Sequence, residues 1–139
     1  MRRLAALLVA AGLVAAVAPA CGDDGPEADR TVEVRMVDIA FEPAAVTASA
    51  GETVRFRFAN DGQQGHDAVV GPVGDQDALE AHIRSGAGYD YYDEDDAVLV
   101  EPGGTGELVV TFDEAGTTLI ACHRPGHYDS GMILTVEVT

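Results

Sequence analysis

Two apolar runs near the end of the chain constrain its fold most strongly. They cover residues 117–121 and 132–138, are rich in β-branched residues, and are separated by a short loop. Such runs on both sides of a turn-forming segment are typical of two paired strands. The loop holds a thiol at Cys122 and an imidazole at His127, and a thioether follows at Met132, in the spacing Cys-x4-His-x4-Met. The sequence therefore predicts a strand–loop–strand unit that presents three potential metal donors.

A thiolate, an imidazole and a weak thioether are three of the four donors in the His2Cys sites with an axial methionine that hold copper for electron transfer. The second histidine must come from elsewhere, and His66 is the candidate because it begins an apolar run after the turn-forming segment 60–65. In a β-sandwich, two loops at the same end can meet. Zinc also binds cysteine and histidine, but a thioether has no purpose in a zinc site. The methionine therefore favours copper.

Each donor also has a purely structural interpretation when it is taken alone. Cys122 could be a small buried hydrophobe, and His66 could be a turn residue. Met132 could belong to the core, since Ile133 and Leu134 follow it. All four residue types at this spacing favour a metal site over these alternatives.

The segment before the loop consists of short alternating runs punctuated by turn residues, which predicts strands with one buried face. In residues 53–59, for example, Val54, Phe56 and Phe58 are expected to face inward and Arg55 and Arg57 outward. One segment differs, because residues 77–80 resemble a helix N-cap with an acidic partner and predict a short helix through about residue 84, ended near residue 86. The fold class expected is all-β, an antiparallel Greek-key β-sandwich with one short inserted helix.

The candidate ligands and several residues upstream of them resemble those of one protein family. The chain resembles the cupredoxins, small type 1 blue copper proteins such as plastocyanin, azurin and rusticyanin, in His66, Cys122, His127, Met132, Gly51-Glu52-Thr53-Val54 and Asn60. The Cys-x4-His-x4-Met spacing is most similar to rusticyanin-like and auracyanin-like members, and the resemblance covers residues 31–139. It implies one copper ion with His66, Cys122 and His127 as equatorial ligands and Met132 as the axial ligand. It also implies that electrons pass at the His127 edge.

Two supporting residues follow from this resemblance. In many cupredoxins an asparagine follows the first histidine and ties the two ligand loops together, but this chain has Asp67 there. A carboxylate can still accept backbone N–H bonds across the loops, although it adds negative charge near the metal. Asn60 is the second supporting residue expected.

The two remaining histidines are not expected to bind the metal. His123 is adjacent to Cys122, so its side chain is predicted to point away from the metal if Cys122 points inward. His82 falls in the predicted helix and is interpreted as a surface or packing residue.

The N-terminal segment is predicted to lie outside the fold. Residues 1–20 have a short basic start, an apolar run and a small-residue cleavage site, which is typical of a signal peptide; an uncleaved anchor is the alternative. Cys21 then resembles the lipid-attachment cysteine of bacterial lipoproteins, although a Cys21–Cys122 disulfide is also compatible with an oxidising compartment. Residues 21–30 are interpreted as a flexible linker and residues 31–139 as the cupredoxin domain.

Charge limits the partners. The chain has no lysine and a formal charge of −16, which argues against nucleic acid because phosphate binding needs a basic face. Redox proteins, including basic ones, are the expected partners, and the acidic segment Asp90–Asp96 could steer them; a merely solvated loop is the alternative. The expected protein is a monomer in the cell envelope or periplasm that contacts the membrane only through an N-terminal lipid.

These features predict an extracytoplasmic carrier of single electrons. The alternative function is a copper-binding or copper-delivery module without an electron-carrier role, since the same four ligands would serve it. An enzyme is not expected. Copper enzymes with cupredoxin domains need further domains and additional histidine-rich sites, and this chain has only four histidines.

Overall fold

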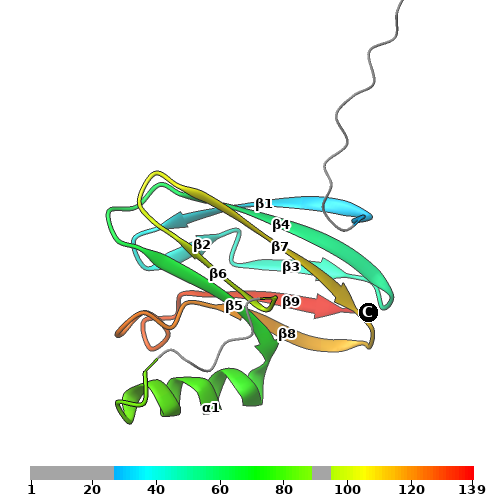
Figure 1. Ribbon diagram of the computed structural model, residues 1–139. Coiled ribbons are helices and arrows are strands. Elements are labelled where there is room, and N and C mark those ends of the chain that lie inside the picture. Colours follow the sequence, from blue (N-terminus) through cyan, green and yellow to red (C-terminus); the bar gives the residue numbers. More distant parts are fainter. Residues whose placement is uncertain (1–26, 89–94) are drawn as a thin grey trace, which may run out of the picture.

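The computed structural model describes residues 27–88 and 95–139, which form two packed β-sheets with one helix outside them (Figure 1). The first sheet has the order β2-β1-β4-β7, made of Ala40–Glu42, Arg30–Val37, Glu52–Asn60 and Thr105–Phe112. The second sheet has the order β3-β9-β8-β5-β6, made of Ala45–Ala48, Ile133–Val138, Gly116–Ala121, His66–Pro72 and Ala97–Val100. The all-β sandwich expected from the sequence is confirmed.

Strand direction differs in part from the antiparallel expectation, because both sheets are mixed. β1 pairs with β4 in parallel, and β3 pairs with β9 in parallel, whereas the other pairs are antiparallel. After β2 the chain crosses to the second sheet, forms β3 at its edge, and returns to the first sheet as β4. Period-2 alternation reports which face of a strand is buried but not the direction of its neighbour. Strand β2 was not predicted, because Pro43 interrupts the run there.

The core lies between the two sheets and contains the apolar face of β4. Val54, Phe56 and Phe58 are fully buried, as predicted. The ring of Phe56 meets the ring of Phe112 edge-on, with their centroids 6.3 Å apart. Arg55 does lie on the opposite face, but it is only 9% exposed because it packs under Glu107 of β7 and donates a hydrogen bond of 2.7 Å to its carboxylate. Each large apolar side chain buried in this way stabilises the fold by about 1.5–3 kcal/mol.

The helix α1, Val73–Arg84, follows β5 directly and lies against the outer face of the second sheet, beside β5 and β8 (Figure 1). It begins earlier than predicted, after Pro72, with no side-chain cap. Asp77 is therefore not the N-cap and lies within the helix instead. The predicted end near Gly86 is confirmed. The capping pattern at Asp77 therefore did not mark the start of the helix. Leu79 and two polar side chains, Gln76 and Glu80, are buried on the face toward the sheet.

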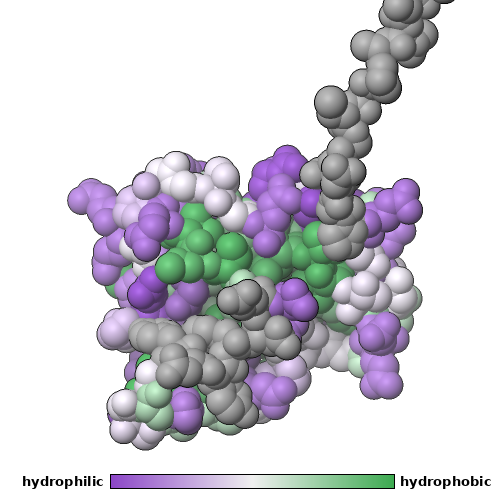
Figure 2. Space-filling model, viewed as in Figure 1, coloured by the Kyte–Doolittle hydropathy of each residue, from purple (hydrophilic) through white to green (hydrophobic). Residues whose placement is uncertain are grey.

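Several predictions from the sequence concern residues outside the described ranges. The signal segment 1–20, Cys21 with its lipid or disulfide, and most of the acidic segment Asp90–Asp96 fall there. Among the described residues, no helix has the length and apolar character needed to cross a membrane. On the face seen in Figure 2, hydrophilic residues occupy much of the outline and apolar residues gather toward the middle.

Candidate metal centre

The pairing of β5 with β8 brings the predicted donors together at one end of the sandwich. These strands are antiparallel neighbours, so the start of β5, where His66 lies, is beside the end of β8, after which Cys122 follows. His127 lies in the loop that continues from Cys122, and Met132 ends this loop just before β9. We call residues 122–132 the ligand loop. It joins β8 and β9, which are paired as the sequence predicted.

The donor atoms of three residues converge on one point. His127 Nδ1 is 3.4 Å from Cys122 Sγ and 3.3 Å from His66 Nδ1, and the third separation, Cys122 Sγ to His66 Nδ1, is 3.9 Å. Donors that surround one first-row metal ion at about 2.0–2.3 Å lie about this far from one another. His66 and Cys122 are fully buried and His127 is 5% exposed. The three residues therefore fit a single enclosed metal ion.

Met132 is linked to this group through the backbone. Its N–H donates to His127 O and its carbonyl accepts from Cys122 N–H, both at 3.0 Å, and its side chain is fully buried. Within the ligand loop, Gly126 and Gly131 have φ near +82° and +84°, a conformation that favours glycine. The loop closes on itself, so that the backbone of Met132 is hydrogen-bonded to both Cys122 and His127.

Asn60 organises the second loop, which leads from β4 to His66. Its side-chain amide donates to Gln64 O at 2.8 Å and Val100 O at 2.9 Å, and its Oδ1 accepts from Gly62 N–H at 2.9 Å. Asn60 is 1% exposed. Because these bonds replace water on every side of the amide, they hold the loop in one conformation immediately before His66.

Asp38, in the turn between β1 and β2, is a supporting residue that the sequence did not reveal. Its carboxylate accepts backbone N–H bonds from Gln63 and Gln64, and the Gln63 bond is the main reason that the pKa of Asp38 is lowered. Its Oδ1 lies 3.5 Å from His66 Nε2, a buried atom that makes no hydrogen bond within the described part of the chain. Carboxylates next to the far nitrogen of a metal-binding histidine orient its ring. No local motif marks this role.

Asp67 ties the two loops together as predicted. Its Oδ1 accepts a hydrogen bond of 2.6 Å from the backbone N–H of His123, and the residue is 5% exposed. Its other oxygen is 3.8 Å from Nε of Arg124. A negative charge therefore lies buried at the site, with an arginine beside it.

Burial shifts the pKa values of two donors, Cys122 and His66, toward their neutral forms. Burial, and then the charge of Asp67, raise the pKa of the Cys122 thiol to about 12, against hydrogen bonds from the N–H groups of Arg124 and Asp67. Burial, followed by repulsion from His127, lowers the pKa of His66. A buried thiolate is costly without a cation beside it. A positive metal ion supplies that cation, so the donor set suits a metal that binds sulfur.

The two other histidines lie apart from the donor group. His123 is fully buried, but its ring nitrogens face Glu80 and Gln76 of α1 rather than the donors, which confirms that its side chain points away. His82 is half-buried on α1. The contact between His123 and α1 was missed, because His123 and its partners are far apart in the sequence.

Comparison with known proteins defines the class. Residues 28–139 match the family model described as copper binding proteins, plastocyanin/azurin family. The chain belongs to this family of copper proteins, and its cofactor is copper.

Individual members of the family show which relatives the chain is similar to. The chain is 40% identical over 116 residues to the copper-resistant cuproprotein CopI of Rubrivivax gelatinosus, covering 83% of this chain and 70% of that protein. It is 31% identical over 110 residues to auracyanin-A of Chloroflexus aurantiacus, covering 70% and 68%. The structure of auracyanin A, a blue copper protein of that bacterium, superposes with a TM-score of 0.64 at 29% identity, covering 78% of this chain and 98% of that one.

Proposed function

We propose that this protein is an exported type 1 copper protein that transfers single electrons between redox partners. His66, Cys122 and His127 are the equatorial ligands and Met132 is the axial ligand. The observation that carries the proposal is the convergence of two ring nitrogens and one sulfur within 4.8 Å of one another, all on buried residues. The family match and the similarity to a blue copper protein support it.

The chemistry follows from how the protein holds these donors. Bound copper supplies a one-electron couple between Cu(I) and Cu(II). The role of the residues is to prevent the ligand set from rearranging between the two states, because such rearrangement slows electron transfer. Asn60 holds the loop before His66, Asp67 ties that loop to the ligand loop, and Met132 closes the ligand loop on Cys122.

Electrons are proposed to enter and leave at the His127 edge. An open hollow of about 480 Å³ lies there, lined by Gln64, Gly65, Glu101, Arg124, Pro125 and His127. Of the proposed ligands, His127 is the one that lines this hollow, so it connects the site with the surface there.

A visible spectrum and a voltammogram of the copper-loaded protein test the proposal. We expect an intense blue or green band and a reversible one-electron couple. Cys122→Ser is expected to abolish the band, because the sulfur–copper bond produces it, whereas Met132→Gln is expected to retain copper and lower the reduction potential. A coloured serine variant would rule out Cys122 as the sulfur ligand.

The second candidate function is copper binding or delivery without electron cycling. Relatives from Rubrivivax gelatinosus and Pseudomonas aeruginosa are named copper-resistant cuproproteins, which favours this function. Transfer of copper from the loaded protein to a competing copper chelator, followed by absorbance, separates the two functions. Rapid release supports delivery, and retention of copper through repeated oxidation and reduction supports the carrier.

Export and lipid attachment at Cys21 are part of the same proposal, on the basis of the N-terminal sequence. Mass spectrometry of the protein from the membrane fraction tests both. A mature chain that begins at an acylated Cys21 is expected. A mature chain that retains residues 1–20 would contradict it.

A further inference from the structure

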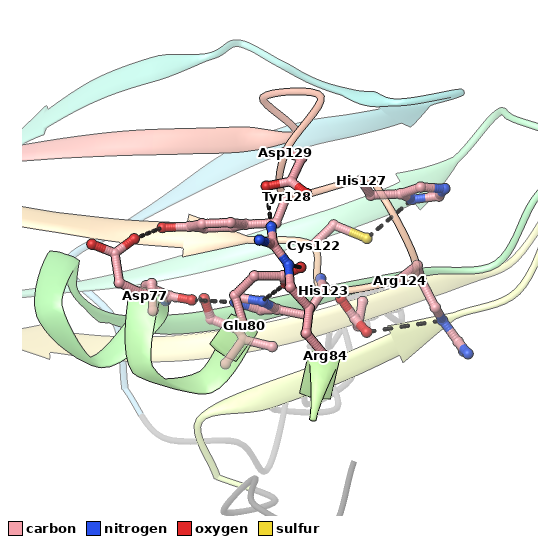
Figure 3. Close-up of polar contacts among 12 residues, drawn as sticks. Asp77, Glu80, Arg84, Cys122, His123, Arg124, His127, Tyr128 and Asp129 are labelled. Carbon is pink, nitrogen blue, oxygen red and sulfur yellow. Dashed lines mark hydrogen bonds and ion pairs between the residues drawn. The ribbon is translucent and has the colours of Figure 1, made fainter. Parts of the chain in front are cut away.

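Helix α1 is attached to the ligand loop by polar side-chain contacts at three loop residues, His123, Tyr128 and Asp129 (Figure 3). His123 contacts Gln76 and Glu80, Tyr128 donates a hydrogen bond of 2.8 Å to Asp77, and Arg84 pairs with Asp129. All the loop residues in these pairs lie in the segment that contains Cys122 and His127. The helix therefore does more than cover the second sheet.

The contact at His123 is the buried one of the three. Its ring is fully buried, with Nε2 2.6 Å from Gln76 Oε1 and Nδ1 2.8 Å from Glu80 Oε2. The amide nitrogen of Gln76 donates to Val69 O and Leu119 O, so the amide oxygen faces the ring and Nε2–H must donate to it. Both ring nitrogens thus contact side-chain oxygen atoms of the helix. A buried network with every member satisfied holds its groups in one arrangement.

Gln76 also anchors the helix to the sheet, because its two carbonyl partners belong to β5 and β8. Glu80 is held in turn by Arg84, whose Nε is 3.0 Å from Glu80 Oε1. On the other side of the ring, Tyr128 stacks on His123 with centroids 4.8 Å apart and planes 16° apart. The imidazole is consequently fixed along its edges and on one face.

His123 follows Cys122 in the chain, which gives this network a consequence for the metal site. The backbone N–H of His123 is bound by Asp67, and its side chain is bound by α1. The peptide between Cys122 and His123 therefore cannot rotate freely, and its orientation sets the direction in which Cys122 presents its sulfur. We propose that α1 positions the ligand loop, with His123 as the positioning residue through which the helix fixes Cys122. This inference rests on the proposed role of Cys122 as a copper ligand.

The test uses the full chain with His123→Ala, Glu80→Ala and Glu80→Gln. In the copper-free proteins, we expect hydrogen exchange at the Cys122, His127 and Met132 amides to accelerate in both alanine variants relative to amides of β4. With copper, we expect the alanine variants to change the ratio of the visible bands and to lose about 10- to 100-fold in copper affinity, as for other residues that orient metal ligands. Glu80→Gln keeps a polar partner for Nδ1, because its amide can donate to that nitrogen or accept from it, and is expected to retain the wild-type spectrum.

Val54→Ala is the matched control, because it removes buried groups from the core of β4 and lowers stability without touching the loop. If His123→Ala and Glu80→Ala lowered only the melting temperature, as Val54→Ala does, the positioning role would be refuted. A glutamine variant that behaved like the alanine variant would also refute it, since charge and not position would then matter. If His123→Ala did not fold, the Glu80 pair would decide. A wild-type protein without a coloured copper complex would contradict the proposed function, while the exchange measurement would still test the helix.

Discussion

At the scale of single residues, the site is distinguished by carboxylates that lie close to the ligands. Asp67 is buried beside Cys122 and His123, and Asp38 lies 3.5 Å from the far nitrogen of His66. A negative charge near the copper stabilises Cu(II), the more positive state, relative to Cu(I). The residues that tie the loops together therefore also influence the reduction potential.

Asp67→Asn tests this electrostatic effect. The amide keeps an oxygen for the N–H of His123 but carries no charge, so we expect the reduction potential to rise by on the order of tens of millivolts. Voltammetry of the two copper-loaded proteins at the same pH measures the shift. An unchanged or lower potential would refute this effect of the Asp67 charge.

At the scale of elements, the site depends on a loop that follows β4 and on the turn that follows β6. Asn60 connects them, since its amide bonds Val100 O and its backbone N–H and carbonyl bond Gly104 and Gly103 at 3.0 and 2.8 Å. β4 and β6 belong to different sheets. One buried side chain therefore joins both sheets at the end where His66 lies.

Asn60→Ala is expected to lower the free energy of unfolding by about 1–3 kcal/mol, because it leaves buried carbonyl groups without donors. It is also expected to weaken copper binding, since the loop before His66 loses its internal support. Urea denaturation and copper titration measure the two effects. Thr117→Ala, at an exposed hydrogen bond of β8, serves as the control and should change neither by much. Copper affinity unchanged in Asn60→Ala would refute the support role.

In the whole molecule, the end of the sandwich opposite the metal site contributes to stability without holding any of the ligands. Phe112 is 4% exposed and pairs with Glu52 at the start of β4, whereas Asn60 lies at the other end of that strand. The metal site lies at the Asn60 end. Changes at the Phe112 end should therefore lower the stability of the fold without changing the site, because the free-energy effects of distant substitutions are usually independent of one another.

Phe112→Ala is expected to cost about 3–5 kcal/mol of stability through the lost packing against Phe56 and the cavity left behind. The increase in melting temperature on adding copper should nevertheless persist, because the ligands are untouched. Thermal denaturation with and without copper tests both statements, and Phe112→Leu should cost less. Loss of the copper-dependent increase in a folded Phe112→Ala variant would show that core and site are coupled.

Much of the fold could be predicted from the sequence because its signals are local. The alternation of Val54, Phe56 and Phe58 depends only on strand geometry, and the ligand spacing from Cys122 to Met132 lies within one loop. His66 could be proposed as the second histidine ligand because the proposal needed only its position at the start of a predicted strand. The parallel pairing of β1 with β4 could not be predicted, since it depends on a crossing between sheets.

Neighbouring residues along the chain were enough to predict the alternating strands and to reveal the donor types and their spacing in the ligand loop. The folded molecule was needed to show where α1 begins, that His123 contacts Gln76 and Glu80, and that Asp38 approaches His66. These contacts join segments that are distant in the sequence, and no local pattern records them. They form because burial of the two sheets brings those segments together and leaves their polar groups to find partners with one another.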